Sequence, residues 1–385
     1  MQPFQITAVN NALQSLSNKQ SDIVVAPGGA GKSHIIKGIL KELPSKDKIV
    51  ILQPTLEILQ QNYDRYIEEV GNDDIGIYSA SAGKKNIGRV TYATIQSIST
   101  KTQMFQDVKY VIIDEAHVVN SDKEQRMYMQ FINDIRPYTI GLTATPYRLN
   151  AKNELKMLHR QEHSVFRDIC FNVSMKSLIE EGRLSKFEYF TVKQINLNSC
   201  LLNGDFDEKL VNRYYLSEAS LLYNIVELIC DYAKKRKHCL IFANSMEMQQ
   251  KIVNLLKQKQ QSVDFVNSSI EMQDRKNKLL TFKNGDVKFM VVINIATVGF
   301  DFPALDTIVM LRPTNSLSFY VQSVTRGSRF SEGKKNCLVL DFANNLENFG
   351  KVEDIKIEKN PMLKNEPYDI FYNGKTSIPF LSEKI

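Results

Sequence analysis

The alternation of short apolar runs with helical stretches, which occurs twice along the chain, most constrains what this sequence can fold into. Buried strands are expected at 21–26, 48–52, 110–114 and 138–142, with helices at 32–43 and 55–69. The rhythm returns later, with strands at 238–242, 263–266, 288–293, 307–311 and 336–341 and helices at 221–234, 246–259 and 272–282. Strands that alternate with helices form parallel sheets covered by helices. The sequence therefore predicts an α/β protein with two such sheets.

The length of 385 residues also favours two domains, because a single core rarely grows beyond about 250–300 residues. We expect residues 1–200 to form the first domain, residues 201–345 the second, and residues 346–385 a loosely structured C-terminal tail. The stretch 150–220, between the two patterns, has mixed polarity and no clear periodicity. The predicted boundary lies within it.

Composition argues against several classes of protein. Hydrophobic residues make up 43% and charged residues 24%, as in ordinary folded proteins, and the longest apolar runs fall far short of the ~20 residues of a membrane helix. We see no secretion leader, and the five cysteines contain no CxxC pair, so neither a disulfide framework nor a zinc module is expected. A cytoplasmic setting follows. The net charge of +6 is compatible with a nucleic-acid partner but does not indicate one.

A glycine-rich segment between a predicted strand and a predicted helix is a candidate phosphate-binding loop. It comprises Ala26, Pro27, Gly28, Gly29, Ala30, Gly31, Lys32 and Ser33. Small residues let backbone N–H groups wrap phosphate oxygens, Lys32 can reach the β- and γ-phosphates, and the Ser33 hydroxyl can ligate Mg²⁺. The strict pattern has Gly where Ala26 stands, and an ordinary glycine-rich turn is the alternative.

Two adjacent carboxylates, Asp114 and Glu115, follow the apolar run of the predicted strand 110–114. In a nucleoside triphosphatase the first holds Mg²⁺, usually through water, and the second polarises the attacking water. A solvated turn would explain Asp-Glu alone, but not the phosphate loop upstream in the same sheet. Because open α/β sheets bind ligands at their strand ends, both groups are expected beside that loop.

The segment Asp114-Glu115-Ala116-His117 resembles the DEAH form of the superfamily 2 helicase box, and other helicase motifs occur in the expected order between about Phe4 and Asp341. These segments are Phe4-Gln5, Gln53–Thr55, Thr91–Ser97, Gly141–Pro146, Ile241–Ser245, Ala296–Pro303 and Gln322–Arg329. The resemblance implies two tandem RecA-like domains with parallel sheets and an ATP cleft between them. It also implies ATP and Mg²⁺ as ligands and nucleic-acid-stimulated ATP hydrolysis as the activity.

The family pattern assigns further residues to the nucleotide. It places Gln5 at the adenine, Gly299 and Asp301 near the ribose, and His117 in a hydrogen bond either to Gln322 or to the 141–146 segment. Gln322, Arg326 and Arg329 are expected to face the nucleotide, because guanidinium groups stabilise the charge of the γ-phosphate in the transition state. Arg329 is the better candidate for an arginine finger. Thr325 stands where the family has Gly, which leaves local backbone geometry and turnover open.

The same pattern gives candidate contacts to a nucleic-acid backbone, namely Pro54, Thr55, Thr94, Gln96, Ser245 and Thr297. Such contacts position a strand without reading its bases. Taken singly, each of these residues is more often a helix cap or a turn residue than a ligand. The basic run Lys234–Lys237 lies at the end of a predicted helix, where cations complement the helix dipole, and we prefer that interpretation to a nucleic-acid patch.

The segments Gly141–Leu149 and Val309–Ser316 are similar to those of RadD-type bacterial DNA-repair ATPases and of short phage helicases, including branch-migration enzymes. RadD-type proteins carry a cysteine zinc element that this chain lacks. The resemblance favours DNA over RNA, the cytosol of a bacterium or phage-infected host, and unwinding or branch migration in repair, recombination or replication. The motifs alone are equally compatible with RNA. Two alternatives are the motor subunit of a restriction-type complex and an ATP-gated DNA-binding or annealing protein with weak turnover.

Overall fold

A computed structural model describes residues 1–70, 74–120, 122–149, 155–161, 163–192, 195–202, 205–217, 219–293, 302–362 and 368–376. The chain divides into two compact units. The first unit comprises Met1–Ser174 together with Lys356–Ile385, and the second comprises Met175–Ile355. None of the described helices combines the length and apolar character needed to cross a membrane.

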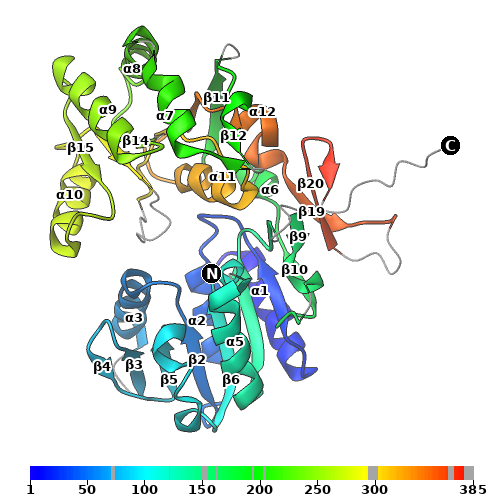
Figure 1. Ribbon diagram of the computed structural model, residues 1–385. Coiled ribbons are helices and arrows are strands. Elements are labelled where there is room, and N and C mark those ends of the chain that lie inside the picture. Colours follow the sequence, from blue (N-terminus) through cyan, green and yellow to red (C-terminus); the bar gives the residue numbers. More distant parts are fainter. Residues whose placement is uncertain are drawn as a thin grey trace. The chain divides into compact units, whose positions relative to one another are not determined.

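The first unit is built on an eight-stranded sheet in the order β10-β1-β7-β6-β2-β5-β3-β4 (Figure 1). The strands are β10 (Asp168–Asn172), β1 (Asp22–Val25), β7 (Tyr138–Thr143), β6 (Val108–Asp114), β2 (Lys48–Leu52), β5 (Val90–Ala93), β3 (Ile75–Ser79) and β4 (Lys84–Lys85). Every described neighbouring pair is parallel except β3–β4. Strands β1 and β5 are buried along their whole length, as expected for a sheet covered on both faces.

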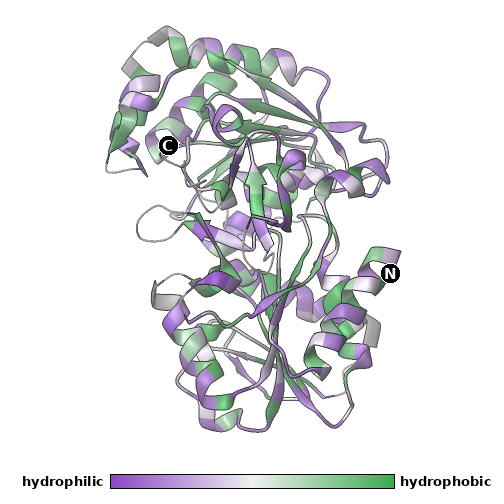
Figure 2. Cartoon of the chain, turned by 90° about the vertical axis from the view of Figure 1, so that its right-hand side faces the viewer, coloured by the Kyte–Doolittle hydropathy of each residue, from purple (hydrophilic) through white to green (hydrophobic). Residues whose placement is uncertain are grey.

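The helices of the first unit follow these strands in the predicted alternation. They are α1 (Pro3–Ser17), α2 (Lys32–Glu42), α3 (Leu56–Val70), α4 (Ile95–Ile98) and α5 (Asp122–Ile135). Hydrophobic and hydrophilic residues alternate around the longer helices, as Figure 2 shows by colour. This pattern is typical of helices that bury one face against a sheet. A small antiparallel pair, β8 (Tyr147–Leu149) and β9 (Leu155–Met157), follows β7.

The second unit contains a six-stranded, fully parallel sheet in the order β11-β18-β17-β14-β16-β15. Its strands are β11 (Lys186–Thr191), β18 (Asn336–Asp341), β17 (Thr307–Met310), β14 (Cys239–Phe242), β16 (Phe289–Val292) and β15 (Val263–Val266). A short antiparallel pair, β12 (Leu201–Leu202) and β13 (Asp205–Phe206), is not part of this sheet. Its helices are α6 (Met175–Glu180), α7 (Glu208–Ser217), α8 (Ala219–Tyr232), α9 (Met246–Gln258), α10 (Met272–Asn284), α11 (Leu317–Val324) and α12 (Asn345–Phe349).

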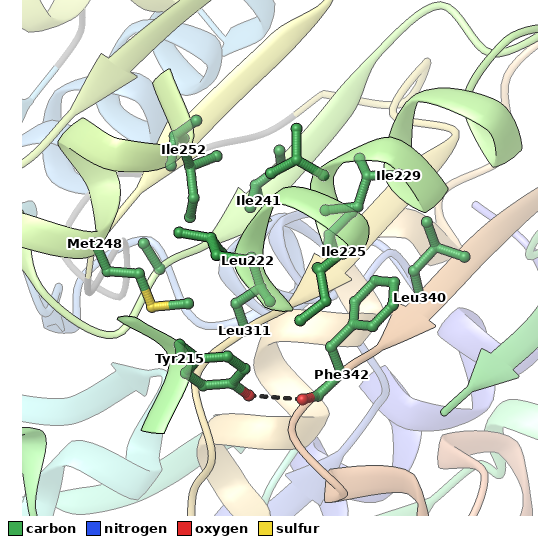
Figure 3. Close-up of a cluster of buried hydrophobic side chains, with 14 of the residues drawn as sticks. Tyr215, Leu222, Ile225, Ile229, Ile241, Met248, Ile252, Leu311, Leu340 and Phe342 are labelled. Carbon is green, nitrogen blue, oxygen red and sulfur yellow. Dashed lines mark hydrogen bonds between the residues drawn. The ribbon is translucent and has the colours of Figure 1, made fainter. Parts of the chain in front are cut away.

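Both faces of this second sheet are covered by apolar clusters. Residues of β14 alternate between the two clusters, with Ile241 in one and Leu240 in the other. Figure 3 shows the first cluster, in which the buried Tyr215 hydroxyl donates a 2.6 Å hydrogen bond to the Phe342 carbonyl. The polar end of this aromatic ring is therefore satisfied inside the core. The predicted fold class, α/β with two parallel sheets of the RecA type, is confirmed.

The division into units differs from the expected boundary between residues 200 and 201. Strand β10 pairs with β1 of the first sheet, whereas β11 pairs with β18 of the second, so the chain leaves the first unit at Ser174. The reason is that strand pairing decides membership, and residues 150–220 contain one edge strand of each sheet.

The C-terminal segment also differs from the loosely structured tail that we expected. Strands β19 (Lys356–Lys359), β20 (Tyr368–Tyr372) and β21 (Lys375–Thr376) form an antiparallel sheet that belongs to the first unit. Asn172 donates a 2.6 Å hydrogen bond to the Ile357 carbonyl, and Arg160 donates one to the Tyr368 carbonyl. The Arg160 guanidinium also lies 3.8 Å from the fully buried carboxylate of Asp369. Long-range polar contacts, which no local pattern reveals, hold this segment in place.

Candidate nucleotide-binding site

The glycine-rich segment forms a tight loop between β1 and α2. Gly29 and Gly31 have φ values of 83° and 77°, in the left-handed region that favours glycine, and Gly31 is the N-cap of α2. A Cβ atom at Gly31 would lie 2.7 Å from the Gln5 Nε2 atom. The loop therefore has the backbone of a phosphate cradle at a helix N-terminus.

Gln5, which the family pattern places at the adenine, packs against this loop. Its Nε2 atom donates a 2.9 Å hydrogen bond to the Ala30 carbonyl, and its Oε1 atom accepts a 2.8 Å bond from the Gln2 amide. The side chain is 6% exposed. One end of the Gln5 amide therefore supports the phosphate loop, and the other end is held at the start of α1.

The end of β6 brings the acidic pair to the same edge of the sheet. Lys32 Nζ lies 3.2 Å from Glu115 Oε1, and His117 Nδ1 lies 3.4 Å from Glu115 Oε2. The Glu115 amide donates a 3.0 Å hydrogen bond to Asp114 Oδ1. Glu115 has a φ of 51°, a left-handed conformation that costs a residue with a side chain about 1–3 kcal/mol. Such strain is common at functional sites.

The two carboxylates experience opposite electrostatic effects. Burial, and then the charge of Glu115, raise the pKa of Asp114 above its usual range. Burial alone would also raise the pKa of Glu115, but the cation of Lys32 and the hydrogen bond from His117 outweigh it and hold that pKa below its usual range. Glu115 is therefore ionised at neutral pH, whereas Asp114 is a buried group that an added positive charge would stabilise.

His117 makes the expected contact to the 141–146 segment. Its Nδ1 atom lies 3.1 Å from Thr143 Oγ1, and the same hydroxyl accepts a 3.0 Å hydrogen bond from the Thr145 amide. The acidic segment after β6 is thus connected to the 141–146 segment after β7.

One residue near this site was missed by the sequence analysis. Asn62 on α3 donates a 3.3 Å hydrogen bond from Nδ2 to Asp114 Oδ2. The two residues are 52 positions apart, and Asn62 belongs to none of the quoted motifs, so nothing in the sequence marked it.

The arginine segment lies in the second unit, in α11 and the turn that follows it. Gln322 lies on α11, and Arg326 in the 3₁₀ turn Thr325–Ser328. The Thr325 side chain is 4% exposed, so the residue that replaces the family's glycine packs inside the unit. A Cβ atom at Gly327 would lie 2.2 Å from Cys337 Sγ, which explains why glycine occupies that position.

Two further residues hold the backbone of this segment. Lys334 Nζ donates hydrogen bonds to the carbonyls of Gly327 at 2.7 Å, Arg329 at 2.9 Å and Pro303 at 3.1 Å. The Ser185 hydroxyl donates a 2.8 Å bond to the Arg329 carbonyl. Burial lowers the pKa of Lys334. The sequence analysis missed both residues because their partners are backbone atoms, which carry no sequence signal.

Several candidate nucleic-acid contacts form hydrogen bonds within their own unit. The Thr55 hydroxyl accepts the Ile58 amide at 3.3 Å, and Ser245 caps α9 by accepting the Met248 amide at 3.1 Å. Thr94 shares a 2.9 Å hydrogen bond with Ser97. Pro54 is half-buried after β2, and Gln96 is exposed on α4. Thr297, Gly299 and Asp301 lie outside the described residues.

The fold and site together define a class. A phosphate loop after one strand and two carboxylates after another strand of the same parallel sheet are the parts of a RecA-like nucleotide-binding domain. The second unit contains another parallel sheet and the arginine segment, and a nucleoside triphosphatase with two domains has the same parts.

Comparison with known proteins places the chain more narrowly. Residues 1–148 match the family model for the type III restriction enzyme, res subunit, and residues 220–331 match the helicase conserved C-terminal domain. The two matched segments are similar to the paired domains of superfamily 2 helicases. This match does not distinguish the DEAH subgroup.

Individual relatives are distant. The chain is 21% identical over 325 residues to the 51.5 kDa protein of a Lactococcus phage, covering 83% of this chain and 65% of that protein. It is 25% identical over 382 residues to the putative ATP-dependent helicase IRC3 of Saccharomyces cerevisiae, covering 89% of this chain and 51% of that protein. It therefore spans less than two thirds of the length of either relative.

Solved structures show the same fold. One is a fragment of a putative HsdR subunit of a type I restriction enzyme from Vibrio vulnificus, with a TM-score of 0.64 and 21% identity. The aligned region covers 90% of this chain and 64% of the HsdR fragment. Another is the type ISP restriction-modification enzyme LlaBIII bound to DNA, with a TM-score of 0.63 and 16% identity. The aligned region covers 89% of this chain and 27% of the LlaBIII chain.

Proposed function

We propose that the chain is an ATP-dependent nucleic-acid translocase or helicase that acts on DNA, in unwinding or branch migration. The observation that carries this proposal is the position of Glu115 between Lys32 and His117, beside a loop that has the backbone of a phosphate cradle. The arginine segment and the match to a helicase C-terminal domain support the motor function. The similarity to RadD-type ATPases and phage helicases favours DNA.

The residues of the first unit fit a magnesium nucleotide. Asp114 is buried, accepts hydrogen bonds from Asn62 and from the Glu115 amide, and lies beside a second carboxylate, and an acidic oxygen site of this kind suits Mg²⁺. Asp114 and the Ser33 hydroxyl would hold the ion. When bound, Mg²⁺ neutralises charge on the β- and γ-phosphates.

The chain's own side chains supply the remaining chemistry. The phosphate loop binds the triphosphate through its N–H groups, and Lys32 contributes the cation that it now shares with Glu115. Glu115, held ionised, accepts a hydrogen bond from the attacking water and orients it, while His117 keeps the carboxylate in place. Arg326 and Arg329 stabilise the charge of the transferred phosphoryl group.

ATP hydrolysis, measured with and without single-stranded and double-stranded DNA and RNA, tests this proposal. We expect stimulation, with DNA more effective than RNA, and its loss in Lys32→Ala. The absence of stimulation by any nucleic acid would refute the motor, and activity that survives Lys32→Ala would refute the site. Strand displacement on forks and four-way junctions then separates unwinding from translocation.

A second candidate is the motor of a restriction-type complex, which the match of residues 1–148 to a restriction-enzyme subunit favours. Stimulation by double-stranded DNA alone, with no strand displacement, would support this candidate. ATP binding with strand annealing but negligible turnover would instead support an annealing protein.

A further inference from the structure

A cavity of about 510 Å³ lies along β11, the outermost strand of the six-stranded sheet in the second unit. Its lining comprises four aromatic side chains, two cations, one carboxylate and one leucine, namely Phe187, Tyr189, Phe190, Tyr232, Arg236, Lys351, Glu188 and Leu338. None of these residues belongs to the helicase motifs. Neither the nucleotide site nor the candidate backbone contacts account for this group.

The aromatic rings form two pairs on opposite faces of β11, since Phe190 packs against one apolar cluster and Phe187 against the other, and the pair that includes Tyr232 offers a stacking surface. The ring centroids of Phe190 and Tyr232 are 4.3 Å apart, and those of Phe187 and Tyr189 are 5.9 Å apart. Tyr232, the last residue of α8, is 41% exposed although its ring contacts Phe190. An exposed ring, backed by a second ring that fixes it, can accept another flat ring at little entropic cost.

The cations around these rings are held in position or exposed. Arg236 donates a 2.6 Å hydrogen bond to Asn336 Oδ1 and lies 3.3 Å from Glu188 Oε2, so its guanidinium plane is fixed at the cavity wall. Lys351 Nζ lies 5.9 Å from the centroid of the Tyr189 ring. Cations interleaved with aromatic faces are typical of surfaces that bind single-stranded nucleic acid.

The basic run 234–237 begins two residues after α8 ends at Tyr232, so it lies at the C-terminal end of that helix, where we expected it to complement the dipole. The same run also borders the cavity. Lys234, Lys235 and Lys237 are exposed in the segment that follows, on either side of the cavity-lining Arg236.

We propose that this aromatic and basic cavity, the β11 cavity, binds single-stranded nucleic acid, with a base stacked on Tyr232 and the neighbouring phosphates facing the lysines and arginine. This rests on the proposed function, since it gives the motor a second contact to its strand. An acidic peptide would satisfy the cations but would leave the paired rings unexplained. Stacking tolerates any base, so the contact lets a motor move along a strand regardless of sequence.

Fluorescence anisotropy with the full chain and a labelled oligothymidylate tests the proposal. Stacking on an aromatic ring contributes about 1–3 kcal/mol per base, so Tyr232→Ala should weaken binding about 5- to 150-fold. Tyr232→Phe should restore it, because the ring remains. Tyr223→Ala is the matched control, since Tyr223 lies on the same helix and is 42% exposed, but does not line the cavity. It should bind like wild type.

Two further readouts identify the interaction. With an abasic oligomer of equal length, Tyr232→Ala and wild type should bind equally, because no base remains to stack. Lys351→Ala and Lys235→Ala should each reduce the slope of log affinity against log salt by about 0.7, as expected when one phosphate contact to a single strand is lost. A parallel series with an RNA oligomer should show the same pattern.

Equal oligonucleotide affinities of Tyr232→Ala and Tyr223→Ala would overturn the proposal, as would selective binding of a poly-glutamate peptide by the β11 cavity. Failure of the proposed function gives a different result, namely a wild-type chain without stimulated ATP hydrolysis. If wild type hydrolyses ATP and binds the oligomer while Tyr232→Ala matches the control, only the inference about the β11 cavity fails.

Discussion

Replacing Arg160 with methionine should release the C-terminal β19–β21 sheet from the first unit. Its guanidinium lies 3.8 Å from Asp369 Oδ1 and also donates a hydrogen bond to the Tyr368 carbonyl. Asp369 is fully buried, so loss of the cation leaves a buried carboxylate without its ion pair. Methionine keeps the apolar stem while it removes the charge.

The structure sets the size of the effect. Removing one partner of a buried ion pair typically costs about 3–5 kcal/mol. Asp369 keeps hydrogen bonds from Asn360 Nδ2 at 3.0 Å and from the Ile370 amide at 2.8 Å, and the ion pair is long. We therefore expect the low end of that range, about 3 kcal/mol, which corresponds to an increase of about 150-fold in local opening.

Hydrogen exchange of the paired backbone amides of β19 and β20 measures this opening directly. Arg167→Met is the matched control, because Arg167 lies 3.9 Å from Asp22 but its side chain is 63% exposed. Asp22 itself is buried but also accepts a 2.7 Å hydrogen bond from the Ser15 hydroxyl. Neither Arg167 nor Asp22 forms a hydrogen bond or ion pair with β19 or β20 in the part of the chain that the structure describes, so this variant should leave exchange in those strands like wild type. If both variants exchange at the same rate as wild type, the Arg160 pair does not hold the segment and our explanation of its docking is wrong.

Other parts of the structure give further predictions. Tyr215→Phe leaves the Phe342 carbonyl without its 2.6 Å hydrogen bond and should lower the free energy of unfolding by about 1–3 kcal/mol in urea; an unchanged value would contradict the buried contact. Burial lowers the pKa of His159 to about 4, so below pH 6.5 this residue binds more protons in the unfolded chain; the change in unfolding free energy from pH 7 to pH 5 should therefore be less favourable in wild type than in His159→Phe by about 2 kcal/mol, and equal changes would contradict the burial. Lys334→Met should lower the kcat of ATP hydrolysis more than it raises KM, whereas a matching loss in the exposed control Lys335→Met would refute the positioning role.

Most of the central strands were predictable because they form nearly continuous apolar runs. Strands β2 and β18 have the predicted bounds, as does the edge strand β15. The edge strands β10 and β11 alternate between more and less buried residues along much of their length, and each is assigned by a partner far away in the chain. Asp168 in β10, for example, pairs with Asp22. Local pattern does not specify such pairing, which explains the shifted domain boundary.

The residues of the candidate site also fall into two groups, those that the sequence identified and those that it did not. Lys32, Asp114 and Glu115 were identifiable because each stands within a contiguous motif whose spacing follows from phosphate and metal chemistry. Asn62 and Lys334 were not, because they contact an aspartate and backbone carbonyls that only folding brings near. Motifs thus predict the groups that touch the ligand, whereas the groups that hold them require the structure.

Glu115 shows why the end of β6 is informative about function. Its left-handed backbone and its position beside the carboxylate of Asp114 are both unfavourable, and a solvated turn would require neither. Lys32 and His117 stabilise the carboxylate, and both belong to the site themselves. A turn selected for stability alone would place asparagine or glycine at a positive φ. The carboxylate at this position is therefore better explained by the chemistry of a phosphate-binding site than by the stability of the fold.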